Sequence, residues 1–298
     1  MGLFNKLFGA KSKGLEPSVS SGMGNGIGSG MSTNSDSSGA DAGVSVEAVN
    51  TGVEHYSSAI EDLANMKETQ AVISLKKSVI SLDKTVISLS KESGFDLTKH
   101  QAKVAVVMDY SGSMDRRYDN GEVQEVLNRL ITLSLRFDDN GELEVWIFSN
   151  RYHRLEPMTI HNFENYVKEE ILRKYYDMGS TEYAPVLEDV MNKYFVEDNV
   201  TSNIPTFVIF ITDGDNDSKD KAPTDRIIVN SAKYNIYFQF VGMGSSNFKY
   251  LQKLDGLPGR PVDNTGFIKV QDFSALSDEE LYTQLLSGYP EWNTKKKV

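Results

Sequence analysis

The sequence KVAVVMDYSGS, residues 103–113, decides the fold of this chain. Its apolar residues follow one another without alternation up to Met108, which is typical of a strand buried on both faces of a parallel sheet. The run stops at an Asp, two Ser and a Gly, residue types that favour turns and helix N-caps. The stretch therefore predicts either an ordinary strand-to-helix turn or a buried strand that carries an oxygen-rich loop to the edge of a sheet.

Strands and helices alternate along the chain downstream of this stretch. Apolar runs predict strands over residues 104–108, 143–148, 206–211, 236–241 and 266–270. Amphipathic patterns predict helices over residues 123–137, 163–175, 184–195, 219–234, 248–254 and 278–286. The alternation predicts an α/β fold with a doubly wound, mainly parallel sheet and helices on both of its faces. In such sheets ligands bind beyond the carboxyl ends of the strands.

The composition excludes several classes of function. The chain has 298 residues, 39% of them apolar, no Cys and a formal net charge of -11. The absence of Cys excludes disulfides, thiolate zinc sites and a Cys nucleophile, and it fits a cytoplasmic location. The negative charge argues against nucleic-acid binding, which usually needs a basic patch. No apolar stretch reaches about 18 residues, so no transmembrane segment is predicted.

The region before the α/β part divides into three segments. Residues 1–45 are rich in Ser and Gly and are predicted to be a flexible, disordered N-terminal segment. Within residues 1–9 the apolar side chains share one helical face, which predicts either a weak peripheral contact with a membrane or partner, or a frayed terminal turn. Residues 46–70 are expected to form a helical linker. Residues 71–102 hold an internal repeat and lead into the first strand.

The repeat has a period of seven residues: VISLKKS, VISLDKT and VISLSKE at 72–78, 79–85 and 86–92. A period of seven is compatible with a short coiled coil that places Val at a and Leu at d. However, each unit holds two or three β-branched residues, and Ile and Leu alternate at i and i+2, which favours strands. We therefore expect a short β-repeat lead-in, which must add to a sheet or pair with another chain.

Three loops carry oxygen ligands to one edge of the predicted sheet. Asp109, Ser111 and Ser113 follow the first strand, Thr181 lies in a loop before a helix, and Asp213 ends the strand that begins near residue 206. Two carboxylates and three hydroxyls suit Mg²⁺ or Mn²⁺, and suit Ca²⁺ less well. Five side chains, some acting through water, leave a coordination position that an acidic group of a partner protein can fill.

These loops resemble a known family. The segment DYSGS at 109–113 resembles the Asp-x-Ser-x-Ser signature of von Willebrand factor A (VWA) domains, and Thr181 with TDG at 212–214 matches the other two loops of that family's metal-ion-dependent adhesion site (MIDAS). The resemblance implies a Rossmann-like VWA domain over residues 103–290, followed by a basic tail over residues 291–298. It also implies that the two serines and Thr181 approach the metal directly, whereas Asp109 and Asp213 act mainly through water.

A narrower resemblance points to tellurium-resistance systems. Residues 87–99, ISLSKESGFDLTK, resemble the lead-in of TerF-like A domains, and YPEW at 289–292 resembles that subgroup's C-terminal signature. The Ser-Leu-x-Lys unit is similar to the opening strands of TerD-type domains, but a whole upstream TerD-type domain is not seen, so a TerD-type calcium site is not implied. The subgroup implies a bacterial cytoplasmic scaffold in stress response or toxic-anion resistance, with other tellurium-resistance proteins as partners.

Two other interpretations are compatible with the same loops. Asp109 after a strand is also compatible with an aspartyl nucleophile, and so with a metal-dependent phosphoryl-transfer or hydrolytic enzyme. No second Asp follows two residues later, and no Gly-x-Ser-x-Gly elbow is present. A third reading keeps the fold but treats the site as vestigial. We expect a binding protein that is not an enzyme.

Other polar residues near the loops have two readings each. Asp215, Asp217 and Asp220 either stabilise the N-terminus of the next helix or surround the metal ligands. Four tyrosines in the predicted loops are candidate anchors for a partner: Tyr152, Tyr175, Tyr176 and Tyr183. The four histidines show no metal-binding spacing and are expected at the surface or in loops: His55, His100, His153 and His161.

Overall fold

The computed structural model describes residues 46–176, 179–198 and 204–296, with side chains from residue 54 onward. The predicted flexible segment 1–45, including the proposed membrane contact of residues 1–9, lies outside the described residues. All described residues belong to one compact unit. No helix in the described ranges combines the length and the apolar character that crossing a membrane requires.

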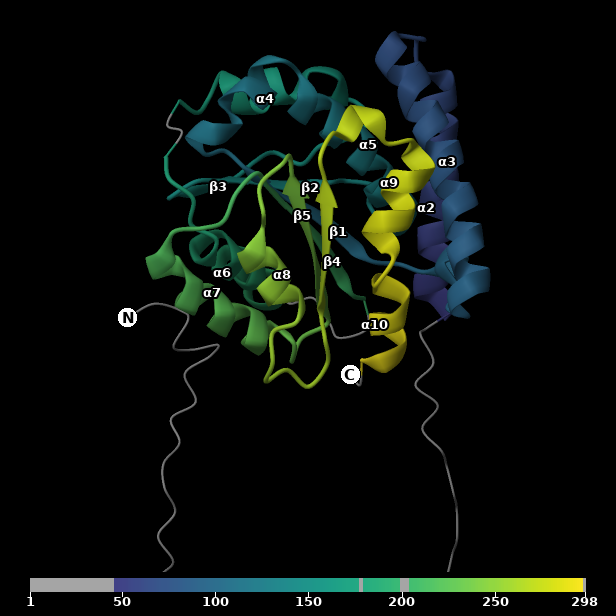
Figure 1. Cartoon of the computed structure of the whole chain (residues 1–298). Helices are drawn as coiled ribbons and strands as arrows, with labels where there is room; N and C mark the ends of the chain where they lie inside the picture. Colours follow the sequence, from purple (N-terminus) through teal and green to yellow (C-terminus); the bar gives the residue numbers. More distant parts are fainter. Residues whose placement is uncertain (1–45, 177–178, 199–203, 297–298) are drawn as a thin grey trace, which may run out of the picture. The chain divides into compact units, whose positions relative to one another are not determined.

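A six-stranded sheet lies at the centre of the described chain (Figure 1), in the order β3-β2-β1-β4-β5-β6. The strands are β1 (Lys103–Asp109), β2 (Glu144–Phe148), β3 (Tyr152–Arg154), β4 (Thr206–Thr212), β5 (Ile236–Met243) and β6 (Thr265–Val270). All neighbours run parallel except β2 and β3. The prediction of a doubly wound, mainly parallel α/β sheet is therefore confirmed.

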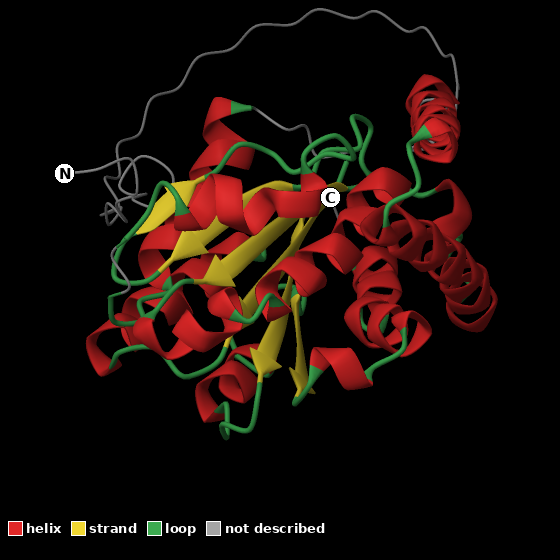
Figure 2. Ribbon diagram, turned by 90° about the horizontal axis from the view of Figure 1, so that it is seen from above, coloured by secondary structure: helices red, strands yellow, loops and turns green. Residues whose placement is uncertain are grey.

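Helices cover both faces of the sheet (Figure 2). The α-helices are α2 (Val46–Asn65), α3 (Gln70–Ser93), α4 (Asp115–Asp119), α5 (Glu122–Phe137), α6 (Ala184–Asn192), α7 (Ser218–Ser231), α8 (Lys249–Asp255), α9 (Asp278–Leu286) and α10 (Tyr289–Lys295). Helix α5 packs on β1, and α3 packs on α5 and α9, whereas α6 packs on α7. In Figure 1, α2 and α3 accordingly form an outer layer beside α5 and α9.

The two central strands end at the same level. β1 pairs with β4 from Lys103 opposite Thr206 to Met108 opposite Ile211, so Asp109 and Thr212 are the next residues of each strand. Between β1 and β4 the winding direction of the chain reverses, and this is the point where α/β sheets open a ligand crevice. The fold therefore brings the loops after residues 109 and 212 together.

The prediction of a β-repeat lead-in over residues 71–102 is wrong, because the repeat forms helix α3. Thr69 caps its start by accepting a hydrogen bond of 3.1 Å from the Val72 backbone nitrogen, and Gly94, with φ of 72°, ends it. Seven residues are close to two helical turns, so the repeat places its a- and d-type residues on one face. That face is buried: Val72, Leu75, Val79, Leu82 and Val86. Burial of this face outweighs the strand preference of the β-branched residues.

Three further features differ from the predictions. The antiparallel strand β3 was not predicted at all. Residues 291–298 were expected to be a basic tail, but α10 continues to Lys295, and its Trp292 is only 2% exposed. His100 lies in a loop, as expected, but it is not free at the surface, because its ring shares a hydrogen bond of 2.9 Å with the Tyr289 hydroxyl and lies edge-on to Phe95.

Candidate metal centre

The carboxylate of Asp109 anchors the site at the end of β1. Its side chain is completely buried. One carboxylate oxygen, Oδ1, accepts a hydrogen bond of 2.7 Å from the backbone nitrogen of Ser111. The other, Oδ2, accepts a bond of 2.6 Å from Oγ1 of Thr212 at the end of β4. Asp109 therefore both shapes the loop that follows it and ties the two central strands together.

The two serines extend this link to Asp213. Ser111 has an extended backbone, and the residues from Gly112 to Met114 form a single 3₁₀ turn, η2. This geometry brings Oγ of Ser111 and Oγ of Ser113 to 3.1 Å from each other. Oγ of Ser113 also donates a bond of 2.7 Å to Oδ1 of Asp213. Four of the five predicted ligands are thus connected through side-chain contacts across the ends of β1 and β4.

Thr181 reaches the same place through backbone contacts. Its carbonyl oxygen accepts a bond of 2.9 Å from the backbone nitrogen of Asp217, in the loop after β4. Two residues earlier, the Gly179 carbonyl accepts a bond of 3.3 Å from the nitrogen of Gly112, between the two serines. The next residue, Glu182, donates to the carbonyl of Ser149 after β2. The Thr181 segment is therefore fixed against all three neighbouring loops.

Asp220 holds the helix that follows Thr181. This buried carboxylate accepts bonds from the backbone nitrogens of Tyr183 at 2.6 Å and Ala184 at 3.2 Å, the residue before α6 and the first residue of α6. The Nδ2 of Asn216 and the hydroxyl of Thr224 also donate to it. Asp220 thus stabilises the N-terminus of α6 rather than that of its own helix α7, and it positions the Thr181 loop from outside the site.

Two residues at the site were missed by the sequence analysis, and one was misplaced. Thr212 was noted only as part of a motif, yet it contacts Asp109 directly. Tyr118 in α4 donates a bond of 2.9 Å to the carbonyl of Asp109. Tyr183 was predicted to be a surface anchor, but it is fully buried, and its hydroxyl bonds the carbonyl of Gly214. The only sign of such contacts in a sequence is the spacing of polar residues at strand ends. This spacing does not show which of those residues make the contacts.

Burial sets the electrostatics of the centre. It raises the pKa of Asp109 to about 6, although the hydrogen bonds from Ser111 and Thr212 act in the opposite direction. The nearby charge of Asp213 raises the pKa further. A cation at this place would favour the ionised carboxylate and compensate for the proximity of the two acids.

The side chains present fit a small, hard cation. All donors are oxygens, and the hydroxyl oxygens of the two serines lie within hydrogen-bond distance of other oxygens, contacts that coordination to a cation can replace. Among the described residues, no group of three or more His, Cys, Asp or Glu side chains is placed to hold a metal ion. A cation here would therefore depend on hydroxyls and on water, which suits Mg²⁺ or Mn²⁺ better than a metal that needs many carboxylates or any thiolate.

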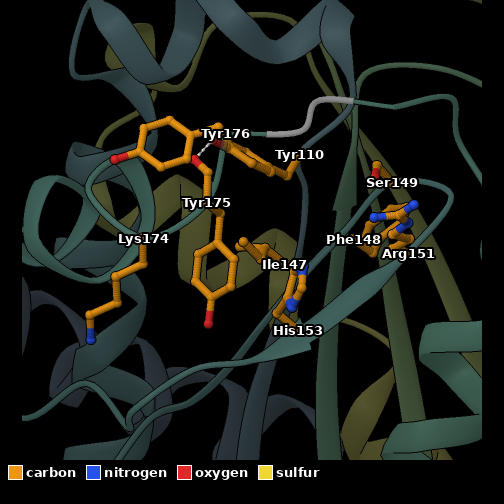
Figure 3. Close-up of a pocket in the computed structure, with 9 residues that line it drawn as sticks. All are labelled: Tyr110, Ile147, Phe148, Ser149, Arg151, His153, Lys174, Tyr175 and Tyr176. Carbon is orange, nitrogen blue, oxygen red and sulfur yellow. Dashed lines mark hydrogen bonds between the residues drawn. The ribbon is translucent and has the colours of Figure 1, made fainter.

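A pocket of about 260 Å³ lies beside the centre (Figure 3). Tyr110, which stands between Asp109 and Ser111, forms one wall, and Tyr175 and Tyr176 form another. Of the four tyrosines predicted as anchors, these last two line the pocket. The pocket extends the candidate site toward β2 and β3.

Several known proteins are similar to this chain. A family model described as the vWA found in the TerF C terminus matches residues 101–298. YcbR of Bacillus subtilis strain 168, an uncharacterized protein, is 40% identical over 203 residues, which cover 67% of this chain and 81% of YcbR.

Among solved structures, the mussel byssus protein PTMP1 with a zinc-occupied MIDAS motif has a TM-score of 0.44 and 20% identity, over 62% of this chain and 48% of PTMP1. Manganese-loaded TRAP of Plasmodium vivax has a TM-score of 0.43 and 21% identity, over 57% of this chain and 69% of TRAP. The family assignment rests on the family model and on YcbR. The chain belongs to the TerF-like family of von Willebrand factor A domains.

Proposed function

We propose that this chain is a metal-dependent protein-binding scaffold. Asp109, Ser111, Ser113, Thr181 and Asp213 hold Mg²⁺ or Mn²⁺, and an acidic side chain of a partner protein completes the coordination shell. The observation that carries the proposal is the chain of contacts from Thr212 through Asp109 and the two serines to Asp213. It gathers hard oxygen ligands at the sheet edge where α/β folds bind ligands.

The charge of the chain supports a bridging role for the cation. With a formal net charge of -11, the chain repels an acidic partner at long range. A divalent cation between two carboxylate-bearing surfaces reverses that repulsion locally. Binding of an acidic partner is therefore expected to require the metal.

The position of Asp109 favours binding over catalysis. A carboxylate nucleophile needs a free oxygen that faces the substrate. Both oxygens of Asp109 already accept hydrogen bonds, from Ser111 and Thr212, and the side chain has no exposed surface. This arrangement supports a scaffold rather than the phosphoryl-transfer or hydrolytic enzyme considered above.

The family description supports a physiological setting. The matching family is named after the C terminus of TerF, and we propose that the chain acts in the cytoplasm of a bacterium, in a tellurium-resistance or related toxic-anion stress response. Its partners there would be other proteins of the same system. Copurification from cells grown with and without tellurite, in the presence and absence of a chelator, tests this setting.

Titration calorimetry of the full chain with MgCl₂ and MnCl₂ tests the metal site. Wild type is expected to bind one cation, whereas Asp109→Ala and Ser113→Ala lose binding. Ser113 is exposed, so its replacement leaves the fold intact. Glu279→Ala, at an exposed carboxylate in the first turn of α9, is the matched control. Equal heats of cation binding for wild type and Asp109→Ala would overturn the proposal. Metal-dependent turnover of p-nitrophenyl phosphate that Asp109→Asn abolishes would favour the enzyme instead.

A further inference from the structure

The pocket beside the metal centre has preformed aromatic walls. The hydroxyl of Tyr110 donates a bond of 2.7 Å to the carbonyl of Tyr175, and the Tyr110 ring packs edge-on against Tyr118 with centroids 5.0 Å apart. The Tyr175 ring in turn lies over His153 of β3, with centroids 4.3 Å apart and planes tilted by 34°. These contacts hold the Tyr110 and Tyr175 rings in place in the lining of the pocket, and Figure 3 shows the bond that joins the two residues.

The pocket and the metal centre share parts of their structure. Tyr110 lies between the proposed ligands Asp109 and Ser111 in the chain. Ser149, which lines the pocket, accepts the backbone hydrogen bond of Glu182, the residue after Thr181. The pocket therefore adjoins the loops of the centre on the β2 side, although none of the five proposed ligands lines it.

The rest of the lining determines what the pocket can accept. Ile147 and Phe148 add apolar surface. Lys174 and Arg151 add positive charge, and Arg151 contributes with burial to the lowered pKa of His153. Lys174 pairs with Glu170, so part of its charge is already compensated. A ring-lined cavity with mixed polar and apolar walls and cations at its border suits an aromatic side chain from an acidic segment, since aromatic rings stack on rings and on guanidinium groups.

We propose that this pocket is a second subsite of the metal centre, which receives an aromatic side chain of the same partner segment that presents the acid to the metal. This inference rests on the proposed function. The cavity volume of about 260 Å³ is enough for one large side chain but too small for a folded element. The partner is thus recognised by an acidic residue and an aromatic residue close together in its sequence.

A phage-displayed library of random peptides, panned on the full chain in MgCl₂ and in EDTA, tests the proposal. Peptides selected in MgCl₂ are expected to combine an acid with a nearby Tyr, Phe or Trp. For such a peptide, Tyr176→Ser is expected to weaken binding roughly three- to tenfold. Tyr176 is 82% exposed, so its loss does not disturb the fold. The matched control is Tyr152→Ser, 38% exposed and on the opposite face of β3 from His153.

A second variant and a double-mutant cycle sharpen the test. Tyr175→Ala removes a wall of the pocket, and its melting temperature shows whether it remains folded. Replacing the aromatic residue of the peptide by Ala should weaken its binding to wild type by the same factor as Tyr176→Ser does. The same replacement should change its binding to the Tyr176→Ser and Tyr175→Ala variants only a little.

The outcomes separate the subsite from the metal site. Metal-dependent peptides without aromatic preference, or equal effects of Tyr176→Ser and Tyr152→Ser, would overturn the subsite and leave the proposed function standing. Aromatic selection that persists in EDTA would overturn its link to the metal. If no peptide is selected in a metal-dependent way and calorimetry detects no heat of magnesium binding, the proposed function itself is overturned.

Discussion

Oγ1 of Thr212 donates a hydrogen bond of 2.6 Å to Oδ2 of Asp109 and so joins the carboxyl ends of the two central strands. Both residues are fully buried. The contact is charge-assisted whenever Asp109 is ionised, and charge-assisted bonds are stronger than neutral ones. Its removal leaves a buried carboxylate oxygen without that donor.

We expect Thr212→Val to lower the free energy of unfolding by about 1–3 kcal/mol above pH 7, the cost of leaving one buried polar group unpaired. Urea denaturation measures this change. Thr212→Ser keeps the hydroxyl and should recover most of the loss. A Thr212→Val protein as stable as wild type would show that the bond contributes nothing net.

Asp220 is expected to affect metal binding without touching the metal. Asp220→Ala removes the carboxylate that caps α6, and it should cost about 1–3 kcal/mol of stability. It should also weaken magnesium binding, because Thr181 precedes this helix. Asp217→Ala, at a half-buried aspartate whose side chain makes no capping bond, is the control. Calorimetry on both variants checks the prediction, and equal magnesium affinities would contradict it.

The helical repeat gives a matched pair of substitutions. Leu82 in α3 is 1% exposed, whereas Ile80 two residues earlier is 56% exposed. Leu82→Ala should lower the free energy of unfolding by about 2–5 kcal/mol through cavity formation. Ile80→Ala should change it by less than about 0.5 kcal/mol, since Ala suits a helix surface. Comparable losses at both positions would argue against this packing of α3.

His100 should make the protein sensitive to acid. Burial lowers the pKa of His100 from 6.5 to about 3, so the folded state keeps the ring neutral while the unfolded state binds a proton. The contribution to stability is complete above pH 6.5 and is lost as the pH falls toward 3, by at most about 1.4 kcal/mol per pH unit.

His100→Gln removes this titration and keeps a polar partner for Tyr289. The difference in unfolding free energy between this variant and wild type should therefore change between pH 6.5 and pH 4. Denaturant titrations at several pH values measure it, with His161→Gln at an exposed histidine as the control. Parallel curves for wild type and His100→Gln would contradict the assignment.

Magnesium should raise the melting temperature of the full chain. A cation that binds only the folded state stabilises it by about 2.7 kcal/mol at a concentration of 100 times Kd. EDTA should reverse the effect, and Ser113→Ala should abolish it. The vestigial reading of the site predicts no shift in any of these samples, so differential scanning fluorimetry separates the two readings.

Much of the central sheet followed from the sequence because its determinants are local. The continuous apolar runs around Val106 and Ile209 predict buried strands directly, and the polar residues at their ends predict the edge at which Asp109 and Asp213 meet. The loop carrying Thr181 follows no strand of its own, so the sequence places it less directly: only its position before a helix and the resemblance to the family assign it to that edge.

The misassigned parts depend on contacts between distant segments. The repeat at residues 72–92 has strand-like composition, and it is helical because α5 and α9 bury one face of it. Strand β3 has three residues, too few for a periodic signal. The position of Tyr183, inside the core rather than at the surface, follows from the α6 cap at Asp220, which lies 37 residues further along the chain.

The Thr181 loop is tied to the other two loops of the centre through main-chain atoms. The nitrogen of Gly112 meets the carbonyl of Gly179, and the nitrogen of Asp217 meets the carbonyl of Thr181. At Gly179 a Cβ would lie 2.0 Å from Oδ1 of the exposed Asn150, so that side chain would have to move. For the Thr181 loop, scaffold and donor are consequently separable in evolution: exchanging the Thr181 side chain can retune which ion the centre prefers while this loop keeps its place.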